Sequence, residues 1–295
     1  MTDLPRHGLV PTMKDYAEEL FDLVARTSTQ LPDDVKRALE VASLNAEEVG
    51  AERNALETML RNAGLARMRR LPICQDTGAL IFTVQAPASF EHRPFEEQVK
   101  AAVARATAEG ILRQNCVETL TGRNTGNNIG CGSPVFHWIE EDTGELRVSL
   151  MLKGGGSENM GAQYSLPDAR LGAARDLNGV RLCILDAVCH AQGMGCAPGI
   201  LGVAIGGDRA TGYEESKRQL LRKIGERNCN PQIAELEITV LEQANSLGIG
   251  PMGFGGKTTL LDVFIGELSR LPACYFVSVS YMCWCCRRQS IILPL

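Results

Sequence analysis

The sequence predicts an α+β fold in which a helical N-terminal subdomain is followed by a mixed α/β body. Between residues 13 and 66, apolar side chains recur at the spacing of amphipathic helices. From about residue 71 onward, short apolar runs alternate with glycine clusters, and helical and strand patterns succeed one another. There is no internal repeat and no low-complexity linker. We therefore expect a helical region at 1–70 and a body at 71–295 that carries the candidate site.

The N-terminal region has start and stop signals for helices. The run Leu31-Pro32-Asp33-Asp34 is typical of a helix start, because the helix dipole favours an acidic side chain in the first turn. Apolar residues then recur at helical spacing up to Leu44. A second helix is expected over residues 46–61, with residues 62–64, which include a glycine, as its end.

In the body, runs of apolar residues mark the expected elements. Continuous or alternating patterns predict strands at 79–85, 146–152, 200–205 and 275–281. Helical patterns predict helices at 95–110, 176–192, 212–224 and 234–247, the last of them ended by Gly248.

Composition and charge limit the classes of function. The chain has 295 residues, of which 44% are hydrophobic and 22% charged, and its formal net charge is −5 at pH 7. The acidic balance argues against nucleic acid or an anionic membrane as a general partner. No apolar run approaches the roughly 20 residues that cross a bilayer, and residues 1–14 have no apolar signal core. We expect a cytoplasmic protein, and an organellar form whose transit peptide has been removed is also compatible.

Three of the eleven cysteines stand apart from the others. Cys74, Cys196 and Cys283 lie beside glycine, proline or polar residues, where a metal could be approached, whereas Cys183 and Cys189 fall inside a helical pattern. The three are far too widely spaced for a zinc finger or a ferredoxin-type run. From residue chemistry alone they are either ligands of a cluster held between several loops or buried thiols.

Glycine-rich segments and arginines provide possible anion sites. The run Lys153-Gly154-Gly155-Gly156 follows an expected strand, and its backbone amides could approach a carboxylate or phosphate; a plain turn is the alternative. Arg113, close to the polar stretch 121–128, could bind a carboxylate bidentately or could be a solvated surface residue.

Residues 250–259 look like a phosphate-binding P-loop but depart from it in two ways. Pro251 stands where the motif requires glycine, and the preceding segment is an expected helix, not a strand. Nucleotide binding is therefore disfavoured.

Taken together, these segments resemble the α subunit or N-terminal half of class I fumarate hydratases and of the related L-tartrate dehydratases. The matching stretches are 72–78, 112–115, 121–126, 153–163, 196–210, 212–228, 247–259 and 271–288. They span nearly the whole chain beyond about residue 60, and so many motifs in the same order are not expected by coincidence.

The resemblance implies a [4Fe–4S] cluster held by Cys74, Cys196 and Cys283, with one iron left without a protein ligand. Such an open iron is a Lewis acid for carboxylate and hydroxyl oxygens. Candidate catalytic residues are Asp76 and Gln75, with Asp76 expected to orient or relay protons for the base and not to be the base itself. The implied substrate-binding set is Gln75, Asp76, Arg113, Gly155, Gly156 and Arg287.

The implied reaction is the reversible hydration of fumarate to L-malate, and the close alternative is the dehydration of L-tartrate. Fumarate is favoured because residues 153–163 and 247–259 look more like the fumarase branch. From a different class, the chain could be a non-catalytic structural subunit with zinc at Cys283, Cys285 and Cys286. An alternative choice of cluster ligand among these last two cysteines also stays open.

In the family, the catalytic threonine and further substrate-binding arginine and lysine residues come from a C-terminal half or a separate β subunit. Either a β subunit or a fused C-terminal half is expected to complete the site, and we expect weak or no activity from this chain alone. The resemblance also implies a homodimer of α/β units. Part of the family carries a histidine near the position of Leu271, so no role for such a histidine is transferred to this chain.

Overall fold

The computed structural model of the chain describes residues 14–141 and 144–295. The segment 1–13, on which nearly all of the signal-peptide argument rests, lies outside the described residues. The α-helices are α1 (Ala17–Thr29), α2 (Asp33–Asn45), α3 (Ala51–Arg69), α4 (His92–Ala108), α5 (Gly155–Glu158), α6 (Leu177–Ala191), α7 (Arg209–Gln219) and α8 (Pro231–Ser246), with a 3₁₀ turn η1 (Pro251–Gly253). The strands are β1 (Ala79–Ala86), β2 (Val135–Glu140), β3 (Glu145–Lys153), β4 (Ala162–Ser165), β5 (Gly199–Ile205), β6 (Leu260–Glu267), β7 (Phe276–Met282) and β8 (Arg287–Pro294).

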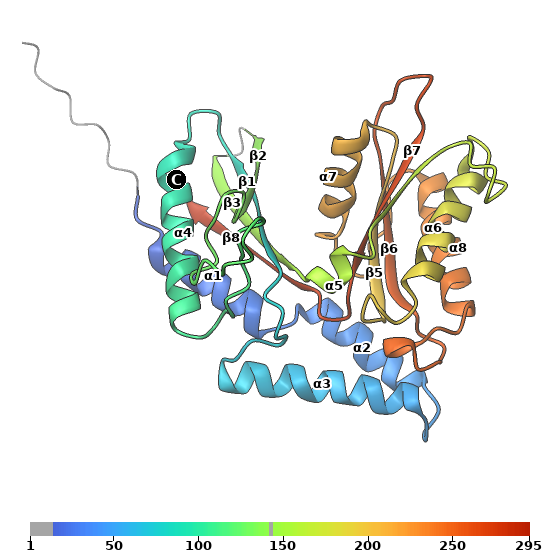
Figure 1. Cartoon of the computed structure of the whole chain (residues 1–295), viewed down its shortest axis with the longest axis horizontal. Helices are drawn as coiled ribbons and strands as arrows, with labels where there is room; N and C mark the ends of the chain where they lie inside the picture. Colours follow the sequence, from blue (N-terminus) through green and yellow to red (C-terminus); the bar gives the residue numbers. More distant parts are fainter. Residues whose placement is uncertain (1–13, 142–143) are drawn as a thin grey trace, which may run out of the picture.

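The strands form two mixed sheets, each in its own lobe (Figure 1). The first sheet has the order β2-β1-β3-β8 and the second the order β4-β7-β5-β6. In each sheet one neighbouring pair is parallel, β1 with β2 and β5 with β6, and the other pairs are antiparallel. The expected α+β class, with helices at the N-terminus, is confirmed.

The first lobe is built around β1 and β3, against which α1 and α4 pack. Leu20 and Val24 of α1 are fully buried with Phe82 of β1 and Val99 of α4 in one hydrophobic core. At the start of α1, the Tyr16 hydroxyl donates to the Pro294 carbonyl at 2.9 Å. The N-terminal helix is therefore part of this lobe's core, and the boundary expected at residue 70 stays a prediction.

The second lobe has a central strand, β5, that is buried along its whole length. Helices α6 and α8 cover one side of its sheet, and α7 lies on the side that faces the first lobe (Figure 1). A Cβ at Gly202 would lie 2.0 Å from the Ser216 carbonyl oxygen, so glycine is needed where α7 meets β5.

A third core joins the two lobes from below (Figure 1). Helices α2 and α3 run beneath both sheets, and the chain crosses from β7 in the second lobe directly to β8 in the first. Val35 and Leu56 of these helices pack in the same cluster as Met151 and Phe264, which come from the two sheets. The cysteines of the β7–β8 link are buried in this shared core.

Most of the expected elements are confirmed, with differences at ends and edges. Helix α3 continues through Gly64 to Arg69, because Ala63 and Ala66 are buried in the shared core and this outweighs a glycine cost of about 1 kcal/mol. Helix α7 ends at Gln219, before the expected 224. Strands β2, β4, β6 and β8 were not predicted. None of the helices in the described ranges combines the length and apolar character needed to cross a membrane.

The ion pair between Asp34 and Arg288 connects α2 to β8. Arg288 Nη2 donates to Asp34 Oδ2 at 2.6 Å and to the Arg222 carbonyl, also at 2.6 Å, and the Ile224 N–H donates to the same carboxylate at 2.8 Å. The two side chains are only 12% and 6% exposed. Burial alone would raise the pKa of Asp34, but Arg288 and the Ile224 amide lower it below its usual value.

We predict that Asp34→Asn lowers the free energy of unfolding at pH 7 by about 3 kcal/mol, because it leaves Arg288 buried without its anion. A lowered carboxyl pKa contributes stability that is present above the unfolded-state pKa, near 3.9, and is lost as pH falls through the folded-state value. Urea titrations from pH 7 to pH 2.5 should therefore show the difference between wild type and variant shrinking in acid. Asp33→Asn, at an exposed position on the same helix, should cost under about 1 kcal/mol. Equal effects of the two variants would contradict this assignment.

Candidate functional site

The first expected cysteine, Cys74, lies in a loop that two helices fix in place. The Ile73 N–H donates to the Ser28 carbonyl of α1 at 3.0 Å, and Asn62 Nδ2 of α3 donates to the Ile73 carbonyl at 2.9 Å. Two residues on, the Asp76 N–H donates to Cys74 Sγ at 3.4 Å. This hydrogen bond ties the Cys74 side chain to the backbone of its own loop.

Cys196 lies in a loop that packs against Tyr281. Its φ is +56°, and its N–H donates to the Gly193 carbonyl at 3.0 Å. Cβ atoms at Gly195 and Gly199 would lie 2.5 and 2.4 Å from the Tyr281 ring, so both positions require glycine. The Cys196 carbonyl accepts the Trp284 N–H at 3.1 Å, which ties this loop to the segment of the third cysteine.

Cys283 follows β7 directly and is 9% exposed. Burial raises the pKa of its thiol to about 12, and Cys196 adds to this while Arg287 opposes it. Burial also raises the pKa of Cys196, with Cys74 and Asp76 contributing. These mutual effects, and their shared hydrophobic cluster, show that three cysteines far apart in the sequence meet in one region. Cys285 and Cys286 are buried in the same cluster.

The three thiols differ from the ligand set of a single metal ion. In the described part of the chain, no three side chains of His, Cys, Asp or Glu are arranged around one ion. That finding gives no support to a compact zinc site at Cys283, Cys285 and Cys286. A cubane cluster spreads its thiolate ligands over separate irons, so the sulfurs lie further apart than around one zinc ion.

Buried polar groups without partners also fit a bound group at this place. Arg287 is 1% exposed, and its Nε and Nη1 have no hydrogen-bond partner among the described residues. The hydroxyl of Tyr281, 2% exposed, also lacks a partner there, and burial together with the nearby Cys283 and Cys196 thiols raises its pKa. Buried donors are nearly always satisfied, so such orphans indicate an acceptor that protein atoms do not supply.

Lys153 is a second buried cation in the same region. Its side chain is inaccessible to solvent, and its Nζ lies 3.1 Å from Glu158 Oε2 and 3.2 Å from Ser157 Oγ. Burial lowers the pKa of Lys153, while Glu158 and Cys283 oppose that change. Glu158 in turn receives a hydrogen bond from Lys217 at 2.5 Å.

Asp76 connects three loops. Its Oδ1 accepts the Gly78 N–H at 2.8 Å and Asn115 Nδ2 at 2.7 Å, and its Oδ2 accepts the Gly155 N–H at 2.6 Å. A Cβ at Gly154 would lie 3.2 Å from Asp76 Oδ2 and 3.8 Å from Arg287 Nη2, so both groups border that glycine. The Gly155 amide, expected to receive an external anion, is thus occupied by Asp76.

The remaining expected site residues lie around this carboxylate. The backbone of Arg113 is held by Thr77, whose Oγ1 accepts its N–H at 2.9 Å and donates to its carbonyl at 2.8 Å. The Arg113 side chain is exposed and forms no ion pair or hydrogen bond with the described residues. Gln75 and Gly156 are exposed on the neighbouring loops.

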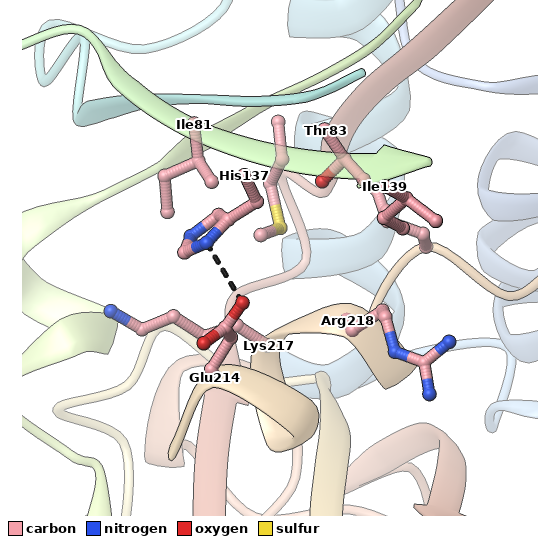
Figure 2. A pocket seen from close by; sticks show the side chains of 9 residues that line it. Ile81, Thr83, His137, Ile139, Glu214, Lys217 and Arg218 are labelled. Atoms are coloured by element: carbon pink, nitrogen blue, oxygen red, sulfur yellow. Dashed lines mark ion pairs between the residues drawn. The ribbon is translucent and has the colours of Figure 1, made fainter. Parts of the chain in front are cut away.

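A separate cavity of about 270 Å³ lies between the first sheet and α7 (Figure 2). Figure 2 shows His137 directed at Glu214, and their side chains are 3.0 Å apart. The wall is mostly apolar and contains none of the cysteines. Lys217 also lines this cavity. Its ammonium group contacts Glu158, which in turn contacts Lys153, so the ion pairs link the cavity to the buried lysine.

The sequence interpretation missed two residues that the structure places at the site. Lys153 was noted only as the start of a glycine-rich run, although a lysine that directly follows the apolar run 150–152 is a recognisable signal of a buried charge. Asn115, which binds Asp76, had no signal beyond its nearness to Arg113.

In the region 250–259 the P-loop context is absent. The segment follows α8, forms a 3₁₀ turn and leads into β6, whereas a P-loop connects a strand to a helix.

The fold brings three cysteines from separate segments together beside buried basic residues, and comparisons assign its family. A model of the fumarate hydratase (Fumerase) family matches residues 17–292. The chain therefore belongs to this family.

Three relatives agree with this assignment. A Geobacillus stearothermophilus protein named "Putative fumarate hydratase class I" is 44% identical over 95% of this chain and 55% of its own length. A Methanocaldococcus jannaschii protein, "Putative L(+)-tartrate dehydratase subunit alpha", is 37% identical over 94% of this chain and 95% of its own. The Escherichia coli K12 "L(+)-tartrate dehydratase subunit alpha" is 32% identical over 94% of this chain and 90% of its own length. The chain thus spans about half of the first relative and nearly all of the two alpha subunits.

We predict that Asp76→Asn loosens the contact between the 74–78 loop and the Gly155 loop. An amide cannot replace all three carboxylate hydrogen bonds, and losing a charge-assisted bond costs about 1.5–3 kcal/mol. Amide hydrogen exchange at Gly78 and Gly155, followed by NMR or mass spectrometry, should become about 10- to 100-fold faster.

The matched control is Asp168→Asn, in a distant loop where the carboxylate accepts the Arg170 and Leu171 amides at 2.9 and 3.2 Å. It should leave exchange at Gly78 and Gly155 unchanged. Unaltered exchange at those glycines in Asp76→Asn would show that the carboxylate does not hold the loops together.

Proposed function

We propose that this chain is the cluster-binding half of an iron–sulfur hydro-lyase that interconverts fumarate and L-malate. The observation that carries the proposal is the convergence of Cys74, Cys196 and Cys283 at a buried place bordered by Arg287 and Asp76. Three thiols from three loops fit a [4Fe–4S] cluster that keeps one iron free of protein ligands. When bound, such a cluster supplies a Lewis-acidic iron for substrate oxygens.

The residues of this chain have separate tasks in that proposal. Arg113, whose backbone is fixed and whose guanidinium is free, binds a substrate carboxylate bidentately. Asp76 keeps the loops of Cys74 and Gly155 in register and orients protons at the site, with Gln75 beside it on the exposed side. The Gly155 amide is taken by Asp76, so the close approach of substrate to the backbone that the lack of side chains at Gly155 and Gly156 allows takes place beside this carboxylate.

The proposal includes a partner. The site residues described here include no base for the proton that hydration moves, and the names of two relatives designate them as alpha subunits. We propose that a β subunit or a fused C-terminal half supplies the missing groups, and that two such units form a dimer. This division is consistent with the relative of which the chain covers only 55%.

L-tartrate is the second candidate substrate, favoured by the names of the relatives at 37% and 32% identity. Fumarate is preferred because the relative at 44% identity bears the fumarate hydratase name. Assaying the enzyme completed with its partner on both acids decides between them. A higher kcat/KM for L-tartrate would reject fumarate as the principal substrate.

We predict that Cys74→Ser, Cys196→Ser and Cys283→Ser each lose the cluster. Wild type, purified and reconstituted without oxygen, should contain about four irons and four acid-labile sulfides per chain, with the broad visible absorption of a cubane. Each serine variant should lose most of this content because three ligands are the minimum for holding the cluster.

The control is Cys189→Ser, an exposed thiol at the end of α6, which should keep the wild-type content. If iron is retained in Cys283→Ser but lost in Cys285→Ser or Cys286→Ser, the third cluster ligand is Cys285 or Cys286 and not Cys283. A chain without iron in any of these proteins would reject the proposed cofactor.

We predict that Arg113→Gln weakens substrate recognition without removing the cluster. Losing a bidentate contact to a carboxylate costs about 1.5–3 kcal/mol, so kcat/KM for fumarate should fall about 10- to 100-fold in the completed enzyme. Arg123→Gln, at a 77% exposed arginine paired with Glu118, should stay within about twofold of wild type. Equal losses in both variants would show that Arg113 has no specific role.

A further inference from the structure

Among the residues that the structure describes, one buried positive charge has no ion-pair partner. Arg287, the first residue of β8, is paired in register with Leu152 and is 1% exposed. It forms no ion pair within the described residues, and two of its nitrogens, Nε and Nη1, lack any partner there. Burying a guanidinium in this way costs several kcal/mol unless an anion and acceptors are supplied.

The neighbouring arginine has a carboxylate partner, although its Nε also lacks a hydrogen bond among the described residues. Arg288, 6% exposed, is paired with Asp34 and also donates to the Arg222 carbonyl. Arg287 has no equivalent carboxylate. The Asp76 carboxylate borders the same glycine, Gly154, but forms no ion pair with Arg287 among the described contacts. The charge of Arg287 lowers the pKa values of the Cys283, Cys285 and Cys286 thiols, which burial raises.

A second cation adds to this imbalance. Lys153 is neutralised by Glu158, but Glu158 is shared with Lys217, so the chain Lys153–Glu158–Lys217 keeps a net positive charge. Both Lys153 and Arg287 act electrostatically on Cys286, and Lys153 also interacts with Cys283. Because Arg287 keeps two unpartnered nitrogens among the described residues, this region is suited to a bound anion.

We infer that Arg287, supported by Lys153, is the counter-charge of the cluster. An oxidised cubane core held by three thiolates is a net anion, and its sulfurs accept hydrogen bonds. Arg287 is thus a positioning residue for the cluster and not a substrate contact as the sequence led us to expect. This inference rests on the proposed function, because it presupposes the cluster at Cys74, Cys196 and Cys283.

The consequence is a specific electrostatic effect on the cluster. One-electron reduction makes the assembly more negative, and a buried cation favours that state. Removing the charge at Arg287 therefore lowers the reduction potential. A role limited to binding a substrate carboxylate would instead change KM in the completed enzyme and leave the potential of the substrate-free cluster unchanged.

The test is an anaerobic redox titration of the reconstituted chain, followed by EPR and visible absorption. We expect Arg287→Gln to disfavour reduction at least tenfold, which is 59 mV for a one-electron couple. Arg287→Lys, which keeps the charge, should stay within threefold of wild type. Lys153→Met provides a second, independent loss of charge and should shift the potential in the same direction.

The control is Arg147→Gln on β3, where the arginine is 48% exposed. It lies five residues along the strand from Leu152, the partner of Arg287, or roughly 17 Å at about 3.4 Å per residue. It should leave the potential unchanged, since exposed charges at this distance are screened.

The outcomes separate the inference from the proposed function. Wild-type potentials in both Arg287→Gln and Lys153→Met, with four irons retained, overturn the inference and leave the cluster in place. A wild-type chain that takes up no iron overturns both. A variant that loses its cluster altogether while keeping its far-UV circular dichroism supports the inference if Arg287→Lys restores the cluster, and contradicts it if Arg287→Lys does not.

Discussion

The candidate site is governed by one electrostatic constraint, the burial of Arg287 without a carboxylate partner. Charges are seldom buried unless they are paired, because desolvation costs several kcal/mol per ion. One residue further along the strand, Arg288 is paired with Asp34. The fold can therefore place a carboxylate beside a buried arginine in this region. Thiols at Cys283 and Cys285 are the groups that the structure places in the field of Arg287. The proposed cluster, an anionic group held by cysteines, would supply the missing partner of Arg287.

The two-lobed architecture explains how three distant cysteines meet. The first lobe provides Cys74, the second provides Cys196, and the direct crossing from β7 to β8 provides Cys283 (Figure 1). Hydrogen bonds between the loops fix their relation, from Trp284 to Cys196 on one side and from Gly155 to Asp76 on the other. Any relative movement of the lobes would alter the spacing of the thiols, which is why the shared core under both sheets matters for function.

The sequence predicted the parts of the fold whose periodicity is strong. Buried β5 and the helices α4, α6 and α8 were expected close to their observed limits, because each buries a face in a large core. Strand β2 is only partly buried, and β8 has four polar residues followed by four apolar ones, so neither presented a clear pattern. The end of α3 was missed because burial of Ala63 and Ala66 overrides the glycine between them.

For the site, the sequence indicated which residues take part but not which contacts they make. The convergence of Cys74, Cys196 and Cys283 came from family resemblance, since no spacing rule links ligands so far apart. Two features depend on tertiary structure: the hydrogen bond from the Gly155 amide to Asp76, and the burial of Lys153 and Arg287. They depend on the register of β3 against β8, which places Leu152 opposite Arg287 and which local pattern does not determine.

The most direct test of the account is a crystal structure of the anaerobically reconstituted chain, with anomalous diffraction measured at the iron edge. The account predicts a compact group of iron peaks bordered by the sulfurs of Cys74, Cys196 and Cys283, with Arg287 beside it and one iron without a protein ligand. Iron bound elsewhere, or a single ion held by Cys283, Cys285 and Cys286, would contradict it.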